Sequence, residues 1–376
     1  MLFDVAILGG GTAGATAALQ LARAGRSVAV LERQPGPPPF KIGEALPPTA
    51  RPLLARLGLL EALSRDPHRP ACANRSAWGS PVLRGQDFLF SRHGLGWHLD
   101  RPELDATLLR LAREAGAAVF QPFRMTSCRR RDGLWRIGGR EQRIAARLAV
   151  DASGRAAVLG RRLGAGREVH DRLLAVYCLF AARPEDEDET ALVESFAEGW
   201  WYTARLPGQL RIAMLMTDKD TPAARSAKRT AGFLAQLART VHAGPRVGDL
   251  APLGPPAATG ANSSRLRPLY GEAWLAVGDA ALSFDPLSSQ GISTALYCAD
   301  KAASALGAVL DGDPGALPAY AALLDQIFSG YLQGHRLAYQ AETRWADRPF
   351  WRRRSPGLSG TSLSSLSAAQ PDGGLP

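Results

Sequence analysis

The sequence predicts an α/β fold with α+β elements, in which a parallel sheet flanked by helices is interrupted by an inserted antiparallel sheet. Residues 4–33 have the pattern of a β-α-β unit built around a glycine-rich turn. Residues 173–217 alternate between apolar and polar side chains in several runs, as strands of a half-buried sheet do. Short glycine- and aspartate-containing motifs follow two more predicted strands, near 151 and near 279, which places them with the first turn in one discontinuous domain.

The individual elements follow from hydrophobic spacing and from chain-breaking residues. An alanine-rich helix runs from the glycine turn to about Ala24, and the proline-rich stretch 35–39 prevents any regular element there. Leucines three and four residues apart predict a helix over 101–115. The remaining predictions are short strands over 117–150, a strand over 274–277, a helix from about Gly291 and an amphipathic helix over 317–345.

These elements divide the chain into two domains, a helical segment and a tail. The first domain comprises 1–75, 100–170 and 265–315, and the second, sheet-bearing domain comprises 76–99 and 171–264. A C-terminal helical segment covers 316–354. The Ser/Gly/Pro-rich stretch 355–376 predicts an unstructured tail.

Composition excludes several classes of protein. The chain has 376 residues, and 45 Lys and Arg against 35 Asp and Glu give a formal charge of +10. Hydrophobic residues make up 46 %, which is enough for a core and excludes a disordered chain. No run of about 20 apolar residues occurs, so we expect no membrane span. The cations are mostly scattered arginines rather than a patch interleaved with aromatics, so we expect no nucleic-acid partner.

Cysteine and histidine usage argues against metals and disulfides. Cys72, Cys128, Cys178 and Cys298 lie far apart with no Cys-x-x-Cys pair. The six histidines show no paired ligand spacing, so we expect no metal site. A strand begins almost at the first residue, with neither a basic segment nor a cleavage site, which predicts no export signal and a cytoplasmic protein.

The segment from Gly9 to Gly14 fits the pattern Gly-x-Gly-x-x-Gly between a strand and a helix, which is typical of a Rossmann-like dinucleotide site. Gly9 would make the tight turn, Gly11 would let the backbone approach a pyrophosphate, and Gly14 would let helix and strand pack closely. Thr12 and Ala13 then lie at the helix amino terminus, which favours negative charge. Glu32, with Arg33 beside it, ends the second strand, where a carboxylate binds the adenosine ribose.

Three later motifs resemble the FAD-binding elements of the aromatic-hydroxylase superfamily, whose fold is that of p-hydroxybenzoate hydroxylase. The segment 275–281 is similar to its second fingerprint, with Gly278 and with Asp279 for the ribityl chain, and it continues into 285–292. Segment 150–155 looks like its Asp-Gly motif. Arg101 matches an arginine that contacts the cofactor. The resemblance implies non-covalent FAD held by these residues, which include Asp151, Gly154, Pro286, Gly291 and Ile292.

Residues 41–48 resemble the Gly-Glu segment of flavin-dependent halogenases and related monooxygenases. Two departures count against halogenation. Those halogenases depend on a lysine after the Gly-Glu segment, and this chain has none from Ile42 to Asp218. Their Trp-x-Trp-x-Ile-Pro block is replaced here by residues 200–207.

The closer resemblance is to flavoproteins that mature peptidyl quinone cofactors, namely the maturases of lysine and glycine oxidases and the tryptophan hydroxylase of quinohemoprotein amine dehydrogenase. The matching stretches are 76–80, 96–101, 284–291, Arg344-Trp345 and 349–351. The resemblance implies a monooxygenase in which NAD(P)H reduces FAD and O₂ forms a C4a-hydroperoxide. Its oxygen would pass to an indole- or phenol-like ring, either of a small molecule or of a tryptophan in a partner polypeptide.

Such a reaction requires an apolar cavity that excludes water from the flavin. The candidates to line it are Trp78, Trp97, His98, Trp200, Trp201 and Tyr202. Strand alternation sends Trp200 and Tyr202 to one face and Trp201 to the other, and core packing is the alternative role for each. The catalytic candidates are His98 as general base, Trp201, and Glu44 as support for the flavin or the pocket. Lys41 is expected to face solvent.

Other functions stay open at this point. The chain could be a flavin-dependent halogenase, an FAD-dependent reductase in natural-product tailoring, or a flavin-binding maturation partner with little turnover. Residues 344–354 combine aromatics with arginines. This segment is either a docking surface for a peptide substrate or a helix terminus packed on the FAD domain.

Overall fold

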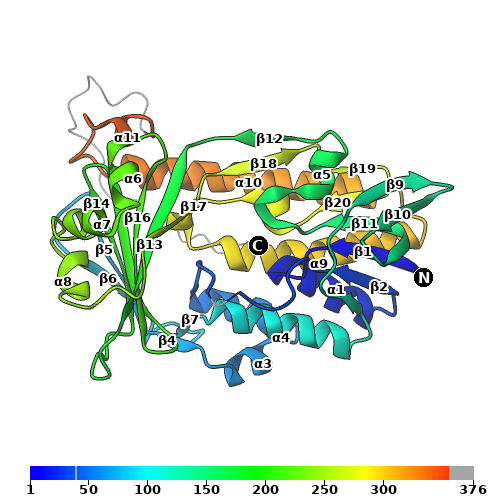
Figure 1. The fold of residues 1–376 in the computed structure, drawn as a ribbon, viewed down its shortest axis with the longest axis horizontal. Helices are drawn as coiled ribbons and strands as arrows, with labels where there is room; N and C mark the ends of the chain where they lie inside the picture. The colour runs from blue at the N-terminus through cyan, green and yellow to red at the C-terminus, as the bar shows by residue number, and fades with distance from the viewer. Residues whose placement is uncertain (39, 355–376) are drawn as a thin grey trace.

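The computed structural model describes residues 1–38 and 40–354 and confirms the predicted α/β fold with a separate sheet-rich region. Figure 1 shows the two parts side by side, with the long helix α10 (Ala316–Gln340) running along both. The tail predicted over 355–376 lies outside the described residues. The boundaries between the two predicted domains stay a prediction.

The first sheet has the order β19-β20-β11-β1-β2-β8, and β10 and β9 extend it from β11. The neighbouring pairs from β20 to β8 are parallel, so their carboxyl ends meet at one edge. Its strands are β1 Leu2–Leu8, β2 Val28–Leu31, β8 Ala118–Phe120, β9 Ser127–Arg131, β10 Leu134–Gly138, β11 Arg143–Asp151, β19 Tyr270–Gly271 and β20 Trp274–Ala276.

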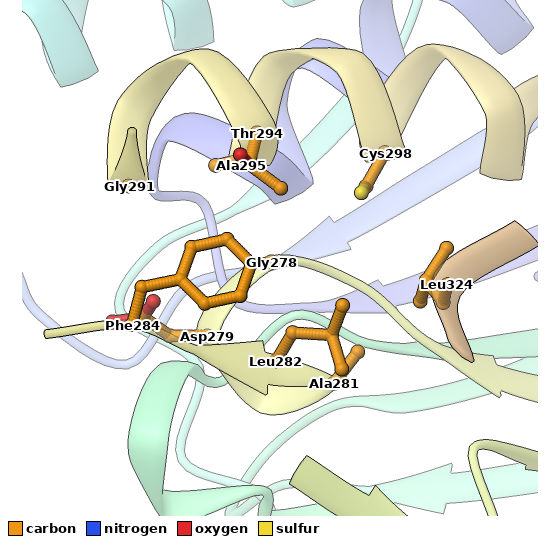
Figure 2. Close-up of a pocket in the computed structure, with 10 residues that line it drawn as sticks. All are labelled: Gly278, Asp279, Ala281, Leu282, Phe284, Gly291, Thr294, Ala295, Cys298 and Leu324. Atoms are coloured by element: carbon orange, nitrogen blue, oxygen red, sulfur yellow. The ribbon is translucent and has the colours of Figure 1, made fainter. Parts of the chain in front are cut away.

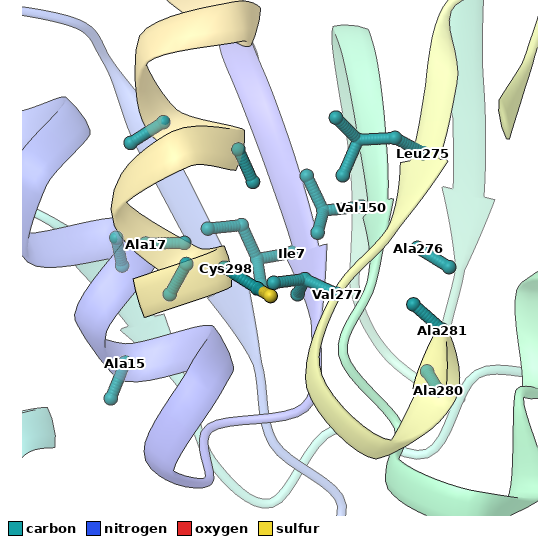
Figure 3. Close-up of a cluster of buried hydrophobic side chains, with 14 of the residues drawn as sticks. Ile7, Ala15, Ala17, Val150, Leu275, Ala276, Val277, Ala280, Ala281 and Cys298 are labelled. Atoms are coloured by element: carbon teal, nitrogen blue, oxygen red, sulfur yellow. The ribbon is translucent and has the colours of Figure 1, made fainter. Parts of the chain in front are cut away.

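The predicted β-α-β unit is confirmed, with α1 (Thr12–Arg23) packed between α4 (Arg101–Glu114) and α9 (Gly291–Leu310). Figure 3 shows why these elements come so close: Ile7, Val150 and Leu275 project from three neighbouring strands towards small side chains of α1 and towards Cys298 of α9. Parallel strands covered on both faces require such unbroken apolar runs.

The second sheet has the order β17-β13-β16-β15-β14-β5-β6 and is mostly antiparallel. Its strands are β5 Ala73–Ala77, β6 Arg84–Asp87, β13 Leu173–Ala181, β14 Thr190–Phe196, β15 Gly199–Leu206, β16 Leu210–Asp218 and β17 Ala257–Gly260. The outer face is covered by three short helices, α6 Pro222–Ala227, α7 Thr230–Leu237 and α8 Ala243–Val247. Trp201 lies on this face, whereas Trp200 and Tyr202 lie on the inner one, which confirms the predicted alternation.

The inner face of the second sheet carries a group of buried side chains, which we call the inner-face cluster. Its buried members are Leu173, Ala175, Ala191, Trp200, Tyr202, Ala204, Leu206, Ile212, Met214, Met216, Ala261, Tyr339, Phe350 and Trp351. Tyr339 comes from the end of α10, and the last two residues come from α11 (Pro349–Arg352). The C-terminal segment is therefore part of the packing of the second sheet.

Two smaller sheets complete the fold. Each has three strands, in the orders β3-β7-β4 and β12-β18-β21. The remaining elements are β3 Ala45–Leu46, β4 Arg69–Ala71, β7 Gly96–His98, β12 Gly166–Val169, β18 Ser264–Arg267, β21 Leu282–Ser283, α2 Arg51–Arg56, α3 Leu60–Arg65, α5 Val158–Arg162 and the 3-10 turns η1 Pro48–Ala50, η2 Gly154–Ala156, η3 Gly278–Ala280 and η4 Pro286–Ser288.

Candidate functional site

The glycine turn after β1 has both tight contacts and open space. Gly9 has a φ of +111°, and a Cβ there would lie 2.3 Å from the Ala152 carbonyl oxygen. A Cβ on Gly14 would lie 2.0 Å from the Gly9 carbonyl oxygen. A Cβ on Gly11, in contrast, would come within 4 Å of only the Lys41 ammonium, at 3.7 Å, in the part of the chain that the structure describes. The protein's own packing thus requires Gly9 and Gly14, and Gly11 leaves room for a ligand.

The amino terminus of α1 is suited to bind a phosphate. Gly11 is its N-cap, and no described side chain accepts a hydrogen bond from its first turn. The free backbone N–H groups at a helix start bind anions, and the helix dipole adds to the attraction. Nearby, Glu32 accepts hydrogen bonds from the Gly10 and Gln34 amides, each over 2.7 Å, while Arg33 is exposed beside it.

A buried polar network connects this turn to α4. The Arg101 guanidinium donates to the Gly43 carbonyl over 2.7 Å and to the Thr12 hydroxyl over 3.1 Å. The Thr12 hydroxyl donates in turn to Asp105 over 2.7 Å. Lys41 Nζ lies 2.5 Å from Asp105 Oδ2, so it is ion-paired rather than simply facing solvent.

The sequence-based reasoning missed Asp105. Burial alone would raise the pKa of its carboxyl, but the charges of Lys41 and Arg101 and the hydrogen bonds from Lys41 and Thr12 lower that pKa below its ordinary value. The available signal was the spacing of four residues from Arg101, which puts both side chains on one face of the helix. Asp105 holds the two cations beside the glycine turn.

Asp151 ends β11 next to the glycine turn, and its carboxyl is occupied by hydrogen bonds from within the protein. It accepts hydrogen bonds from the Ser153 hydroxyl over 2.6 Å, from the Ser153 amide over 3.0 Å and from the Gly160 amide over 2.8 Å. Gly154 follows with a φ of +67°. Asp151 therefore fixes the loop whose Ala152 contacts Gly9, and direct contact of Asp151 and Gly154 with the cofactor stays a prediction.

The second fingerprint lies opposite the first turn. Gly278 has a φ of +59°, and a Cβ there would lie 2.6 Å from the Cβ of Ala13. The Asp279 side chain is 48 % exposed and lies 3.7 Å from Arg155, so it can reach a bound molecule. Figure 2 shows the small cavity beside it, between η3 and the first turns of α9. Its lining residues are Gly278, Asp279, Ala281, Leu282, Phe284, Gly291, Thr294, Ala295, Cys298 and Leu324.

The loop between this fingerprint and α9 contains the other predicted contacts. Pro286 begins η4, and Gly291 and Ile292 begin α9. Ser289 has a φ of +50°, so the chain turns sharply just before the helix. The predicted cofactor-binding residues thus lie at the carboxyl ends of strands of the first sheet, at the starts of α1, α4 or α9 or, in the case of Pro286, in the loop before α9, and this arrangement fits FAD.

Glu44 and Tyr202 meet where the loop after the proline-rich stretch contacts the second sheet. Glu44 is 2 % exposed and accepts a hydrogen bond from the Gly43 amide over 2.9 Å. Burial raises the pKa of its carboxyl. The neighbouring Tyr202 hydroxyl and the charge of Arg101 lower that pKa and offset only part of the rise. The Tyr202 hydroxyl has no well-aligned hydrogen-bond partner among the described residues, although it lies close enough to Glu44 to affect its pKa.

His98, on β7, is fully buried, and neither ring nitrogen has a hydrogen-bond partner among the described residues. Burial lowers its pKa to about 4. The nearby Asp188 and the Arg205 backbone only partly offset that effect, and the charges of Arg69 and Arg211 add to it. The imidazole is therefore neutral near pH 7 and is a weaker base than an ordinary histidine, and its role as a general base stays a prediction.

The structure does not bring Trp201 together with Glu44 and Tyr202. Trp201 is fully buried on the outer face, where its ring meets Phe233 of α7 edge to face at 5.1 Å. Trp97 packs in the core of the first sheet beneath the Arg51 guanidinium, 4.1 Å away. Trp78 and Trp200 join the inner-face cluster, with ring centroids 6.4 Å apart.

The described residues hold no cluster of three or more potential metal ligands. Over the same residues, no helix is both long and apolar enough to cross a membrane.

Comparison with known proteins places these observations in a family. The family described as FAD binding domain matches residues 3–326. LodB of Marinomonas mediterranea, named as an FAD-dependent oxidoreductase, is 30 % identical over 94 % of this chain and 96 % of its own length. A tryptophan 2-halogenase of Chondromyces crocatus is 27 % identical over 91 % of this chain and 66 % of its own length.

Solved structures show the same fold. The flavin-dependent halogenase CmlS superposes with a TM-score of 0.82 at 25 % identity, over 94 % of this chain and 68 % of its own. The peptidyl tryptophan dihydroxylase QhpG superposes with a TM-score of 0.73 at 24 % identity, over 98 % of this chain and 82 % of its own. This chain therefore belongs to the FAD binding domain family, within the superfamily of flavin-dependent oxidoreductases and halogenases.

Proposed function

We propose that this protein is an FAD-dependent monooxygenase that uses NAD(P)H and O₂ to hydroxylate an indole- or phenol-like ring, with a tryptophan of a partner polypeptide as its substrate. Non-covalent FAD would lie along the carboxyl edge of the first sheet. Its pyrophosphate would meet Gly11, Thr12 and Ala13, its ribose Glu32, and its ribityl chain Asp279. The loop from Pro286 to Ile292 would contact the ring.

Bound FAD would supply the redox and oxygen-activating chemistry, and the protein must supply a dry, shaped cavity. The observation that carries the proposal is the contact of both flavin-side loops with the inner-face cluster. Phe40 and Ile42 from one loop and Leu287 from the other pack against it. An aromatic ring held between these loops and the sheet would meet apolar and aromatic side chains, which favour such a substrate over a charged one.

Glu44 and Tyr202 are the polar groups at that contact. A carboxyl whose pKa is raised by burial keeps its proton to a higher pH than an exposed glutamate does. It can give a proton to the reacting centre or take one from a ring hydroxyl or indole N–H. His98, neutral and without a partner among the described residues, is the second candidate acceptor.

Halogenation is the second candidate function, because several similar proteins are named as halogenases. The four lysines of the chain lie at other places. Lys41 is paired with Asp105 at the glycine turn. The other three, Lys219, Lys228 and Lys301, all follow Asp218 in the sequence, and none of them belongs to the inner-face cluster. The lysine that the resemblance requires of a halogenase is therefore not available from the segment after Glu44.

The test uses FAD-loaded protein with NADH or NADPH, ¹⁸O₂ and four probes: indole, L-tryptophan, p-cresol and the peptide Gly-Trp-Gly. The proposal expects a probe to stimulate NAD(P)H oxidation and to gain an oxygen atom from labelled O₂. A mass gain that requires bromide or chloride would instead establish halogenation. Oxidation that proceeds without O₂ would establish a reductase, and binding without turnover would establish a maturation partner.

A further inference from the structure

Three side chains of α10 close around one buried carboxyl in the loop before α9. Tyr331, His335 and Tyr339 are four residues apart, so they lie on one face of the helix. Asp285, which has no exposed surface, accepts hydrogen bonds from the Tyr339 hydroxyl over 2.7 Å and from the Leu287 amide over 2.9 Å. His335 Nε2 lies 3.1 Å from the same oxygen that Tyr339 contacts.

The backbone of Asp285 is held by the same helix. Its amide donates to the Tyr331 hydroxyl over 2.9 Å, and that hydroxyl also contacts the Ser263 hydroxyl at 2.6 Å. Both carboxyl oxygens and the backbone amide of Asp285 thus have hydrogen-bond partners, as buried polar groups generally do. The loop that begins at Asp285 is fixed to α10 at its first residue.

Tyr339 also contacts the second sheet. The Trp200 indole N–H donates to the Tyr339 hydroxyl over 2.9 Å, and Trp200 belongs to β15. Burial, and then the nearby Asp285, raise the pKa of Tyr339 well above its ordinary value, so the hydroxyl keeps its proton and donates it to Asp285. One hydroxyl therefore bridges the second sheet and the loop that precedes α9.

We propose that Tyr339 is a positioning residue that sets the flavin loop, 285–291, at a fixed place relative to the inner face of the second sheet. This inference rests on the proposed contact of that loop with FAD. The hydrogen-bonded series from Trp200 through Tyr339 to Asp285 transmits the position of β15 to the flavin ring. Tyr339 bonds to Asp285, the first residue of that loop, so its assigned role is to position the loop rather than to take part in the chemistry.

The test compares Tyr339→Phe with Thr240→Val. Thr240 is a control that follows α7 on the outer face of the second sheet: it is buried, and its hydroxyl donates to the Leu237 carbonyl over 2.6 Å. Each substitution removes one buried hydroxyl that donates a hydrogen bond and keeps the rest of the side chain's shape. Three properties are measured on purified protein reconstituted with FAD: the FAD dissociation constant, the visible absorption spectrum of the bound flavin and its reduction potential.

Tyr339→Phe is expected to weaken FAD binding by up to about tenfold, the limit reached if the whole free energy of the lost Tyr339–Asp285 hydrogen bond acts on the position of the loop, and to shift the flavin spectrum and potential. Thr240→Val is expected to lower thermal stability and to leave the bound flavin's spectrum and potential as in the unchanged protein. An unaltered spectrum and potential in Tyr339→Phe would overturn the inference. Equal shifts in both variants would also overturn it, because they would show a general loss of packing.

A second pair of variants tests the link to the sheet. Trp200→Phe removes the donor to Tyr339, whereas Trp351→Phe removes an indole of the same cluster whose N–H donates to the Phe196 carbonyl over 2.8 Å. The inference expects a flavin spectral shift in the first variant only. If the unchanged protein itself takes up no FAD, the proposed function fails. If it takes up FAD and no variant alters the flavin, only the present inference fails.

Discussion

Lys41 and Asp105 form an ion pair directly beside the glycine turn, with Nζ 2.5 Å from Oδ2. The same ammonium lies 3.7 Å from the place where a Cβ of Gly11 would be. Asp105 is mostly buried and Lys41 is 41 % exposed at its side chain, so the cation faces the space that Gly11 leaves open. A cation held there by a buried carboxylate is positioned to bind a pyrophosphate.

Lys41→Gln is therefore expected to weaken FAD binding about five- to tenfold, an effect of the size of one charge-assisted hydrogen bond. The contribution of a half-exposed charge falls with ionic strength, so the difference from the unchanged protein should shrink in high salt. Fluorescence titration of FAD at two salt concentrations measures both the loss of affinity and its dependence on salt. Lys301→Gln, on the outside of α9, is the matched control. Equal affinities for Lys41→Gln and the control would place Lys41 outside the cofactor site.

Gly11→Ala and Gly14→Ala are expected to fail for different reasons. A Cβ on Gly14 would lie 2.0 Å from the Gly9 carbonyl oxygen, so this variant should lose about 3 kcal/mol of unfolding free energy even without FAD. Gly11 has an ordinary φ of −74° and open space, so Gly11→Ala should change that free energy by less than about 1 kcal/mol. It should nevertheless lose FAD binding. Denaturant unfolding and FAD titration separate the two effects, and normal FAD uptake by Gly11→Ala would contradict the proposed approach of the pyrophosphate.

The elements of this fold that depend on local patterns could be predicted from the sequence. The glycine turn, the opposite faces of Trp200 and Trp201, and the start of α9 at Gly291 all follow from spacing within a few residues. The contacts that could not be predicted join segments far apart in the chain. Asp105 meets Lys41 across 64 residues, and Tyr339 meets Asp285 across 54. Single-sequence patterns give the faces of helices, but they do not give the partner that a face will meet.

Glu44 predicts a specific dependence of stability on pH. Burial raises the pKa of its carboxyl in the folded state above the ordinary value of 4.5. Above pH 4.5 the unfolded chain therefore releases this proton before the folded chain does, and the free energy of unfolding falls as the pH rises. Glu44→Gln removes the carboxyl that takes up this proton, and with it this dependence of stability on pH. Its stability relative to the unchanged protein should rise as the pH is raised above 4.5, as measured by urea unfolding of FAD-free protein. A difference that does not change with pH would mean that Glu44 ionises normally.

His98 predicts the opposite dependence, on the acid side. Its pKa is lowered from 6.5 to about 4, so below pH 6.5 the unfolded chain binds a proton that the folded chain does not. The free energy of unfolding should fall by up to roughly 3 kcal/mol as the pH drops through this range. His98→Asn should remove this part of the acid sensitivity. His93→Asn, at a partly exposed position, serves as the control. Parallel curves for His98→Asn and the unchanged protein would contradict the buried neutral imidazole.

The C-terminal arginines predict where a polypeptide substrate could dock. Arg344 is paired with the buried Glu342 and contacts Ser195, and Arg353 and Arg354 are paired with the buried Asp218. Trp345 packs against the inner-face cluster, so replacing it would test packing rather than docking.

Arg348 and Arg352, in contrast, are exposed and form no ion pair with another described residue. Reversing both charges, in Arg348→Glu with Arg352→Glu, should therefore leave the fold and FAD occupancy intact. It should weaken binding of a synthetic peptide with one tryptophan among glutamates by about tenfold at low salt, because two attractive charges become repulsive. The same peptide with lysines in place of the glutamates is the control and should bind the variant better. If both peptides bind the variant and the unchanged protein alike, this end of the chain is not a docking surface and its arginines serve the packing of α11.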